Sequence, residues 1–242
     1  MTFKSEIFEI CQQVAVEFHG WKFTSSGDFV NKALKHTDLI VSPGFVFNAE
    51  PSCSVSPVAG IKNRKIVRLY KDLFGREPFW TLSVKFQLES EKYRGAISVK
   101  RIYPQKVPFT TAHEEPNCWP DGFIVRAEAL TYLRGVLTDG RRYVEKYFDL
   151  SSEESLLRNL PVSYQWMDKG IGNSGQMGSF YEESDGIVHC LAAIILGDFD
   201  FVERYRSDEF KTMTPKRVHE IDKIVSVLPE LKRRFSETGS VV

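Results

Sequence analysis

The ten residues 80–89, WTLSVKFQLE, decide the fold class of this chain. Every second residue in them is apolar, and the residues between are polar. A period of two points successive side chains to opposite faces of a strand, so one face is wholly apolar and the other polar. Such a strand is typical of an antiparallel sheet with one covered face, because the strands of parallel sheets are buried on both. The apolar set is Trp80, Leu82, Val84, Phe86 and Leu88; the polar set is Thr81, Ser83, Lys85, Gln87 and Glu89.

Further strands are expected on both sides of this stretch. Residues 89–95, ESEKYRG, read as a turn, after which 96–103, AISVKRIY, should return as the partner strand. Upstream, WKF and DFV flank the turn signal SSG at 25–27 and predict a hairpin. A third strand is predicted from Leu39 to Phe47, interrupted at Pro43, and residues 51–58 are interpreted as loop or edge strand.

Apolar residues at helical spacing predict helices before, within and after this sheet. We expect one at 5–18, with Ser5 as its cap and Gly20 beyond its end, and one at 61–74, stopped by Gly75. From 122 onward the pattern is helical, with a break at Asp139 and Gly140. The serines of SSEESLLRNL predict a capped start, and two helices around LGDFD, residues 196–200, make an αα-hairpin. A last helix, 216–235, is expected to kink at Pro229, and the end, SETGSVV, to fray.

These elements predict an α+β protein: an antiparallel sheet with one face covered by helices, followed by a mostly helical C-terminal part. The first part covers residues 1–103 and the helical part covers residues 122–242. A connection at 104–121 holds four of the eleven prolines. The two parts are either separate domains or one domain with a continuous core.

Composition bounds the compartment and the classes of partner. The 242 residues include 32 basic and 32 acidic ones, so no net charge draws the chain to nucleic acid or to an anionic membrane. The first residues lack the basic segment followed by an apolar segment that marks a signal peptide, so none is expected. The longest apolar run, 187–196, is far shorter than the roughly 20 residues of a membrane span. We expect a soluble, cytoplasmic protein without a disulfide framework, in which Cys11 and Cys190 are buried thiols.

The segment 170–175, GIGNSG, matches the glycine pattern of dinucleotide-binding turns. That site needs a strand before the loop, a helix directly after it and an acid about 20 residues later. Here the chain continues as QMGSFYEESDG, with two more glycines and three acids, so no helix begins where a pyrophosphate needs its amides. We interpret the segment as a surface loop whose exposed backbone can still bind a partner.

Other candidate sites also favour structural interpretations. His189 and Cys190 are neighbours about 100° apart on a helix, so they cannot act on one another and are expected to be a packed histidine beside a core thiol. His113, Glu114 and Glu115 lack the second histidine of a zinc protease. The acids at the hairpin turn, Asp198, Asp200 and Glu203, are read either as helix caps or as an acidic corner for a basic partner. No catalytic, cofactor-binding or metal-binding residue is predicted.

The N-terminal part resembles a group of small bacterial domains. A helix followed by Gly20, Trp21, Lys22 and Phe23, then a turn, Phe29 and a strand, is similar to immunity proteins encoded beside polymorphic toxins. The resemblance covers roughly residues 5–100. It implies stoichiometric binding to a toxin, blocking the toxin's active site, with no catalysis by this chain.

The first hypothesis is therefore a cytoplasmic protein-binding module of the immunity type, whose partner is another protein, a toxin domain, and neither nucleic acid nor membrane. One alternative is a hydrolase or transferase whose site is assembled from distant residues. A second is a structural protein of a phage or mobile element. The loops 104–121 and 170–186 and the acidic turn are expected to supply the partner-binding residues Glu114, Glu115, Trp119, Glu182, Glu183, Asp185, Asp198 and Asp200.

Overall fold

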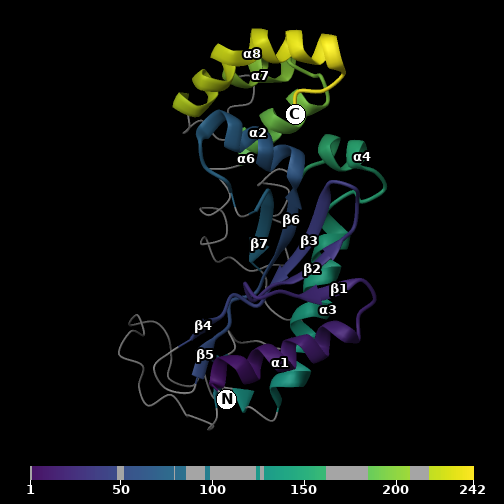
Figure 1. Cartoon of the computed structure of the whole chain (residues 1–242), viewed down its shortest axis with the longest axis vertical. Helices are drawn as coiled ribbons and strands as arrows, with labels where there is room; N and C mark the ends of the chain where they lie inside the picture. Colours follow the sequence, from purple (N-terminus) through teal and green to yellow (C-terminus); the bar gives the residue numbers. More distant parts are fainter. Residues whose placement is uncertain are drawn as a thin grey trace. The chain divides into compact units, whose positions relative to one another are not determined.

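The computed structural model describes residues 2–47, 52–78, 80–85, 96–98, 124–125, 128–161, 185–207 and 218–242 (Figure 1). It confirms the predicted α+β class, with an antiparallel sheet and with most helices in the C-terminal part. The chain divides into two compact units. Unit 1 is Met1–Lys32, Leu39–Ala59 and Val84–Val144, and unit 2 is Ala33–Asp38, Gly60–Ser83 and Glu145–Val242. The predicted connection, 104–121, lies outside the described residues.

The larger sheet has five strands in the order β1-β2-β3-β6-β7. Its first two strands form the predicted hairpin, in which Trp21 pairs with Asn31 and Phe23 with Phe29. The turn between them closes where the Thr24 amide donates to the Asp28 carbonyl. The strands are β1 Trp21–Phe23, β2 Phe29–Lys32, β3 Thr37–Ser42, β6 Val58–Asn63 and β7 Leu82–Lys85.

A second sheet, β4-β5-β8-β9, corrects three predictions. The third strand is interrupted at Pro43, as predicted, but its second part, from Val46, belongs to this sheet and not to the larger one. Gly44 between the two parts has a φ of +63°, and a Cβ there would lie 2.1 Å from the Ser56 carbonyl oxygen. Residues 51–58 include an inner strand of this sheet. Residues 96–98 pair with β5 and β9 instead of β7. The strands are β4 Val46–Phe47, β5 Ser52–Ser54, β8 Ala96–Ser98 and β9 Ile124–Val125, and the β8–β9 pair is parallel.

The predicted partner for β7 was wrong because β6 was hidden in the sequence. Residues 58–63, VAGIKN, run directly into a helix, so their apolar residues merge with the helical pattern of 61–74. Gly60 permits the pairing of β6 with β7, since a Cβ there would lie 2.2 Å from the Leu82 carbonyl oxygen. The alternation predicts that Thr81 faces solvent, but it is 3% exposed. The residue is hydrogen bonded to β6: its amide donates to the Ile61 carbonyl, and its hydroxyl accepts from the Asn63 backbone amide.

Seven described helices complete the fold. The N-cap of the first helix is Thr2, one turn earlier than the predicted Ser5, whose amide it accepts. The third helix runs without a break through Asp139 and Gly140, which are both buried. The serine-capped helix and the αα-hairpin are confirmed. The helices are α1 Phe3–Val16, α2 Arg64–Phe74, α3 Ala129–Tyr147, α4 Glu153–Arg158, α6 Asp185–Ile195, α7 Asp200–Arg206 and α8 Val218–Thr238.

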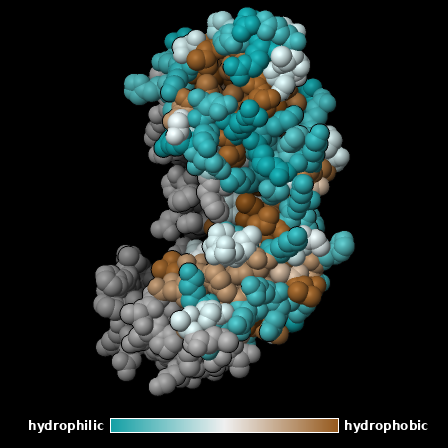
Figure 2. Space-filling model, viewed as in Figure 1, coloured by the Kyte–Doolittle hydropathy of each residue, from teal (hydrophilic) through white to brown (hydrophobic). Residues whose placement is uncertain are grey.

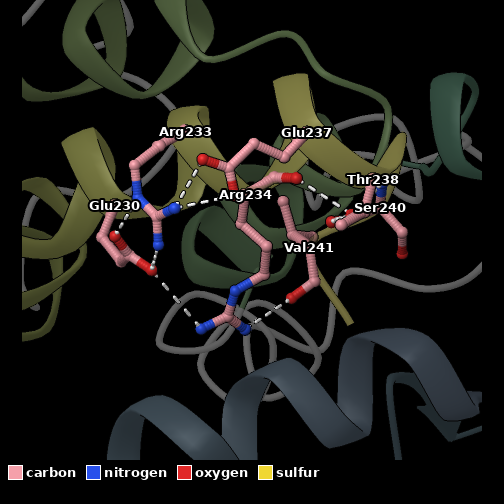
Figure 3. Close-up of polar contacts among 7 residues, drawn as sticks. All are labelled: Glu230, Arg233, Arg234, Glu237, Thr238, Ser240 and Val241. Atoms are coloured by element: carbon pink, nitrogen blue, oxygen red, sulfur yellow. Dashed lines mark hydrogen bonds and ion pairs between the residues drawn. The ribbon is translucent and has the colours of Figure 1, made fainter.

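The end of the chain is ordered, so the predicted fraying was wrong. After α8, Gly239 adopts a φ of +71° and its amide donates to the Phe235 carbonyl, which reverses the chain. Val241 is consequently 1% exposed, and Arg234 donates to its carbonyl oxygen at 3.2 Å (Figure 3). Burial of one apolar side chain and the hydrogen bonds of the helix end both oppose the entropy that favours fraying.

The core of unit 2 is built around α6, which contacts α2, α4, α7 and α8. Its residues from Ile187 to Ile194 are almost all buried, as the apolar run predicts. The turn that follows depends on Gly197, whose φ is +81° and whose added Cβ would lie 2.7 Å from the ring of Phe235 on α8. This turn therefore sets how closely α6 and α7 approach α8.

We predict that Gly197→Ala destabilises the protein more than Gly75→Ala does. Both glycines follow helices with positive φ, but Gly75 has no atom within 4 Å of an added Cβ. The backbone penalty of about 1–2 kcal/mol is common to both, and the clash with Phe235 adds to it only at residue 197. Urea denaturation of both variants gives the comparison. Equal losses would show that Phe235 does not restrain the turn.

Candidate functional site

The side chain of Asn63 in unit 2 is completely buried and forms hydrogen bonds through both its oxygen and its nitrogen. Its Oδ1 accepts from the amides of Lys65 and Ile66 at 3.1 Å and so caps α2. Its Nδ2 donates to Thr37 Oγ1 at 2.8 Å and to Glu153 Oε2 at 2.9 Å, and its own amide donates to Thr81 Oγ1 at 2.8 Å. One residue therefore ties together β3, β6, α2 and α4.

Glu153, the first residue of α4, completes this cluster. Its Oε2 also accepts from the Thr37 hydroxyl at 3.0 Å, and its Oε1 accepts from the His36 backbone amide. Ser152 caps the same helix by accepting the Ser155 amide at 2.9 Å. We call Thr37, Asn63, Thr81 and Glu153 the polar node. Both carboxylate oxygens have donors, so the node is suited to holding elements together.

His189 and Cys190 on α6 lie as the sequence predicts, packed in the core. Desolvation lowers the pKa of His189 to about 4, although a hydrogen bond to the Pro161 carbonyl favours the charged form. Its Nε2 has no hydrogen-bond partner among the described residues. Burial raises the pKa of the Cys190 thiol to about 12 and raises that of Cys11. A nucleophilic cysteine needs a lowered pKa, so neither thiol is suited to nucleophilic catalysis.

Three of the eight predicted partner-binding residues fall within the described chain. Asp185 is the first residue of α6, and Asp198 and Asp200 are exposed at the turn into α7. Asp198 Oδ1 accepts from the Phe201 amide at 3.3 Å, which supports the capping interpretation of this turn. Glu114, Glu115, Trp119, Glu182 and Glu183 lie outside the described residues, as do the segment 170–175 and the His113 motif.

Unit 1 carries a surface that the sequence analysis missed. Phe8 of α1 stacks edge-on against Phe23 at 5.1 Å between ring centroids and lies 6.1 Å from Phe47. The ring centroids of Phe45 and Phe3 lie 5.5 and 6.3 Å from that of Phe47, so the rings join α1 to β1 and β4. All five rings are only half-buried. We call this set, Phe3, Phe8, Phe23, Phe45 and Phe47, the aromatic face.

A cation borders the aromatic face. The ammonium of Lys4, which is exposed, lies 5.2 Å from the ring centroid of Phe8 and 5.8 Å from that of Phe47. Figure 2 shows hydrophobic residues gathered over the strands and helix of unit 1. Half-exposed aromatic rings next to a cation are typical of protein interfaces, where Phe and Tyr are enriched.

The sequence contains the residues of the polar node and the aromatic face, but local patterns do not indicate which of them meet in the fold. Asn63 lies inside the predicted helix 61–74, whereas it caps a helix that begins at Arg64, and its buried contact with Glu153 spans 90 residues. Phe8 lies in the helix predicted at 5–18 and Phe3 lies just before it, whereas Phe45 and Phe47 lie in the predicted third strand. Only the tertiary fold brings these rings together.

Comparisons with protein-family models, with curated proteins and with solved structures found no match. Within the described ranges, no three His, Cys, Asp or Glu side chains are placed to hold a metal ion. No helix in the same ranges is long and apolar enough to cross a membrane.

We predict that Asn63→Ala lowers the free energy of unfolding by roughly 2–4 kcal/mol, because it removes a helix cap and leaves Glu153 short of a donor. The matched control is Asn159→Ala, an exposed asparagine whose side chain donates only to Asp149. That control should change stability by no more than about 0.5 kcal/mol. Chemical denaturation measures both, and similar losses would mean that the node does not hold unit 2 together.

We also predict that the protein loses stability as the pH falls from about 7 to about 4. The unfolded chain protonates His189 near 6.5, whereas the folded chain does so only near 4. The stability that the neutral histidine contributes is therefore fully present above the unfolded pKa of 6.5 and is lost as the pH falls toward the folded pKa of about 4. The total loss should reach roughly 3 kcal/mol. The slope should diminish in His189→Gln and persist in the control His219→Gln, whose histidine is exposed. An unchanged slope in His189→Gln would contradict the assignment.

Proposed function

We propose that this chain is a protein-binding module of the immunity type, which acts by stoichiometric binding to a toxin domain. The observation that carries the proposal is the aromatic face of unit 1. Its five half-buried rings contribute apolar area with little conformational entropy to lose on binding, and such rings dominate the energetics of interfaces.

The thiols of Cys11 and Cys190 are buried with raised pKa values, and His189 is held neutral. Neither alternative hypothesis, an enzyme or a phage structural protein, gains a supporting observation among the described residues.

The resemblance on Gly20, Trp21, Lys22, Phe23 and Phe29 connects this surface to the immunity-type hypothesis. Phe23 and Phe29 pack at 5.0 Å between centroids, and Phe23 is part of the aromatic face. A stable complex buries about 800 Å² on each partner, which requires neighbouring residues in addition to the rings.

The test uses the protein encoded by the reading frame next to this gene. We predict a one-to-one complex in light scattering after size-exclusion chromatography, and rescue of cells from that protein's toxicity. Phe47→Lys should weaken binding by about a hundredfold, since it removes a central ring and adds a buried charge. Lys4→Glu, at an exposed position, should weaken it less without affecting the fold.

The control is Val16→Lys, which changes an apolar residue on the same helix that is 86% exposed and remote in sequence from Phe8. It should bind as the unmodified protein does. Absence of a complex with the neighbouring protein would overturn the immunity-type function. A complex that is insensitive to Phe47→Lys and Lys4→Glu would move the interface away from the aromatic face.

A further inference from the structure

Unit 2 has a concentration of positive charge at the start of α2. Arg64, Lys65 and Arg68 occupy its first two turns, and Lys35 lies in the turn before β3. The Arg64 amide donates to the His36 carbonyl, and the Arg64 guanidinium donates to the carbonyl of Lys35, which joins the turn to the helix. We call Lys35, Arg64, Lys65 and Arg68 the basic corner.

The charges of the basic corner are not neutralised by ion pairs among the described residues. Lys35, Arg64 and Arg68 are exposed and Lys65 is half-buried, and none of them pairs with a carboxylate there. The neighbouring Glu153 accepts from three donors, Thr37 and Asn63 of the polar node and the His36 backbone amide, and Glu154 pairs with Arg158 at 2.8 Å. By contrast, Lys62 and Lys71 of the same unit both lie within 4 Å of Glu77.

Folding accounts for Arg64, which joins the turn to the helix, but no described contact accounts in this way for the charges of Lys35, Lys65 and Arg68. The N-terminus of a helix carries partial positive charge, so acids stabilise it and cations do not, yet the first turn of α2 contains no acid. The cations also affect His36, whose pKa is lowered by desolvation and then by Lys65, Lys35 and Arg64. Exposed cations that oppose both the helix dipole and one another are expected where an anion is bound.

We propose that the basic corner binds an acidic segment of a protein, rich in Asp and Glu side chains. Two of the four cations are arginines one turn apart on α2, and guanidinium groups form paired hydrogen bonds with carboxylates. Among the described residues, none of these four cations lies over an aromatic ring on which a base could stack beside it, and the four charges occupy one helix start and one turn. These features favour a carboxylate-bearing peptide over a nucleic-acid strand.

This proposal is independent of the aromatic face, which belongs to unit 1. It is tested on the full chain with a fluorescein-labelled oligoglutamate peptide, by fluorescence anisotropy at about 0.01 M ionic strength, where the Debye length is about 30 Å. The unmodified protein should bind, and binding should weaken strongly at about 0.15 M salt. Lys35→Glu/Arg68→Glu should reduce affinity at least about tenfold, because each reversal replaces an attraction with a repulsion.

The matched control, Lys22→Glu/Lys71→Glu, changes the net charge by the same amount at exposed lysines outside the corner. It should bind within about twofold of the unmodified protein. Equal losses in the two double variants, or no binding at low salt, would overturn the proposal. Tighter binding of a single-stranded oligodeoxynucleotide of the same charge, lost in Lys35→Glu/Arg68→Glu, would also overturn it and assign the corner to nucleic acid. Retained thermal unfolding midpoints show that both variants fold.

Discussion

Glu153 and Asn63 meet inside unit 2, and the arrangement of that unit depends on their contact. A carboxylate at the start of α4 accepts from the turn before β3, from the first residue of β3 and from the last residue of β6. Because Asn63 both ends β6 and caps α2, the strand and the helix are positioned by the same side chain. A partly satisfied node would leave buried polar atoms without partners, so the elements it joins should form together.

Unit 1 uses a different kind of interaction for the same purpose. Phe8 and the rings around it join α1 to β1 and β4 through stacking, and Glu17, the C-cap residue of α1, pairs with Arg134 of α3 through two hydrogen bonds of 2.6 and 2.7 Å. That pair is about 40% exposed at both side chains, so it contributes little stability. The completely buried residues of α1 are Ile7, Cys11 and Val14, and the rings beside them are only half-buried. A surface that holds its own unit together is thus still partly open to water.

The sequence predicted those features that depend on local periodicity. The β1–β2 hairpin, the Ser152 cap and the α6–α7 hairpin each rest on a few neighbouring residues, whose turn and cap chemistry is nearly independent of the remaining chain. Long-range pairing could not be read in this way. Residues 58–63 merge with a helical pattern, and the alternation of 80–89 identifies a strand without identifying its neighbour. Gly60 admits that neighbour because two backbones approach closely, and this reason appears only in three dimensions.

The candidate surfaces were missed for a related reason: composition averages over the whole chain. Equal numbers of basic and acidic residues predict no overall field, and this remains correct at long range. At short range, basic and acidic side chains are paired in some places and not in others. On α8, Arg233 is held between Glu230 and Glu237, and Arg234 is 3.9 Å from Glu230, so that each charge meets its opposite (Figure 3). On α2, Arg64, Lys65 and Arg68 lie close together and have no such partner within the part of the chain that the structure describes. Because screening limits exposed charges to about 10 Å at moderate salt, a partner meets the local group and not the neutral sum.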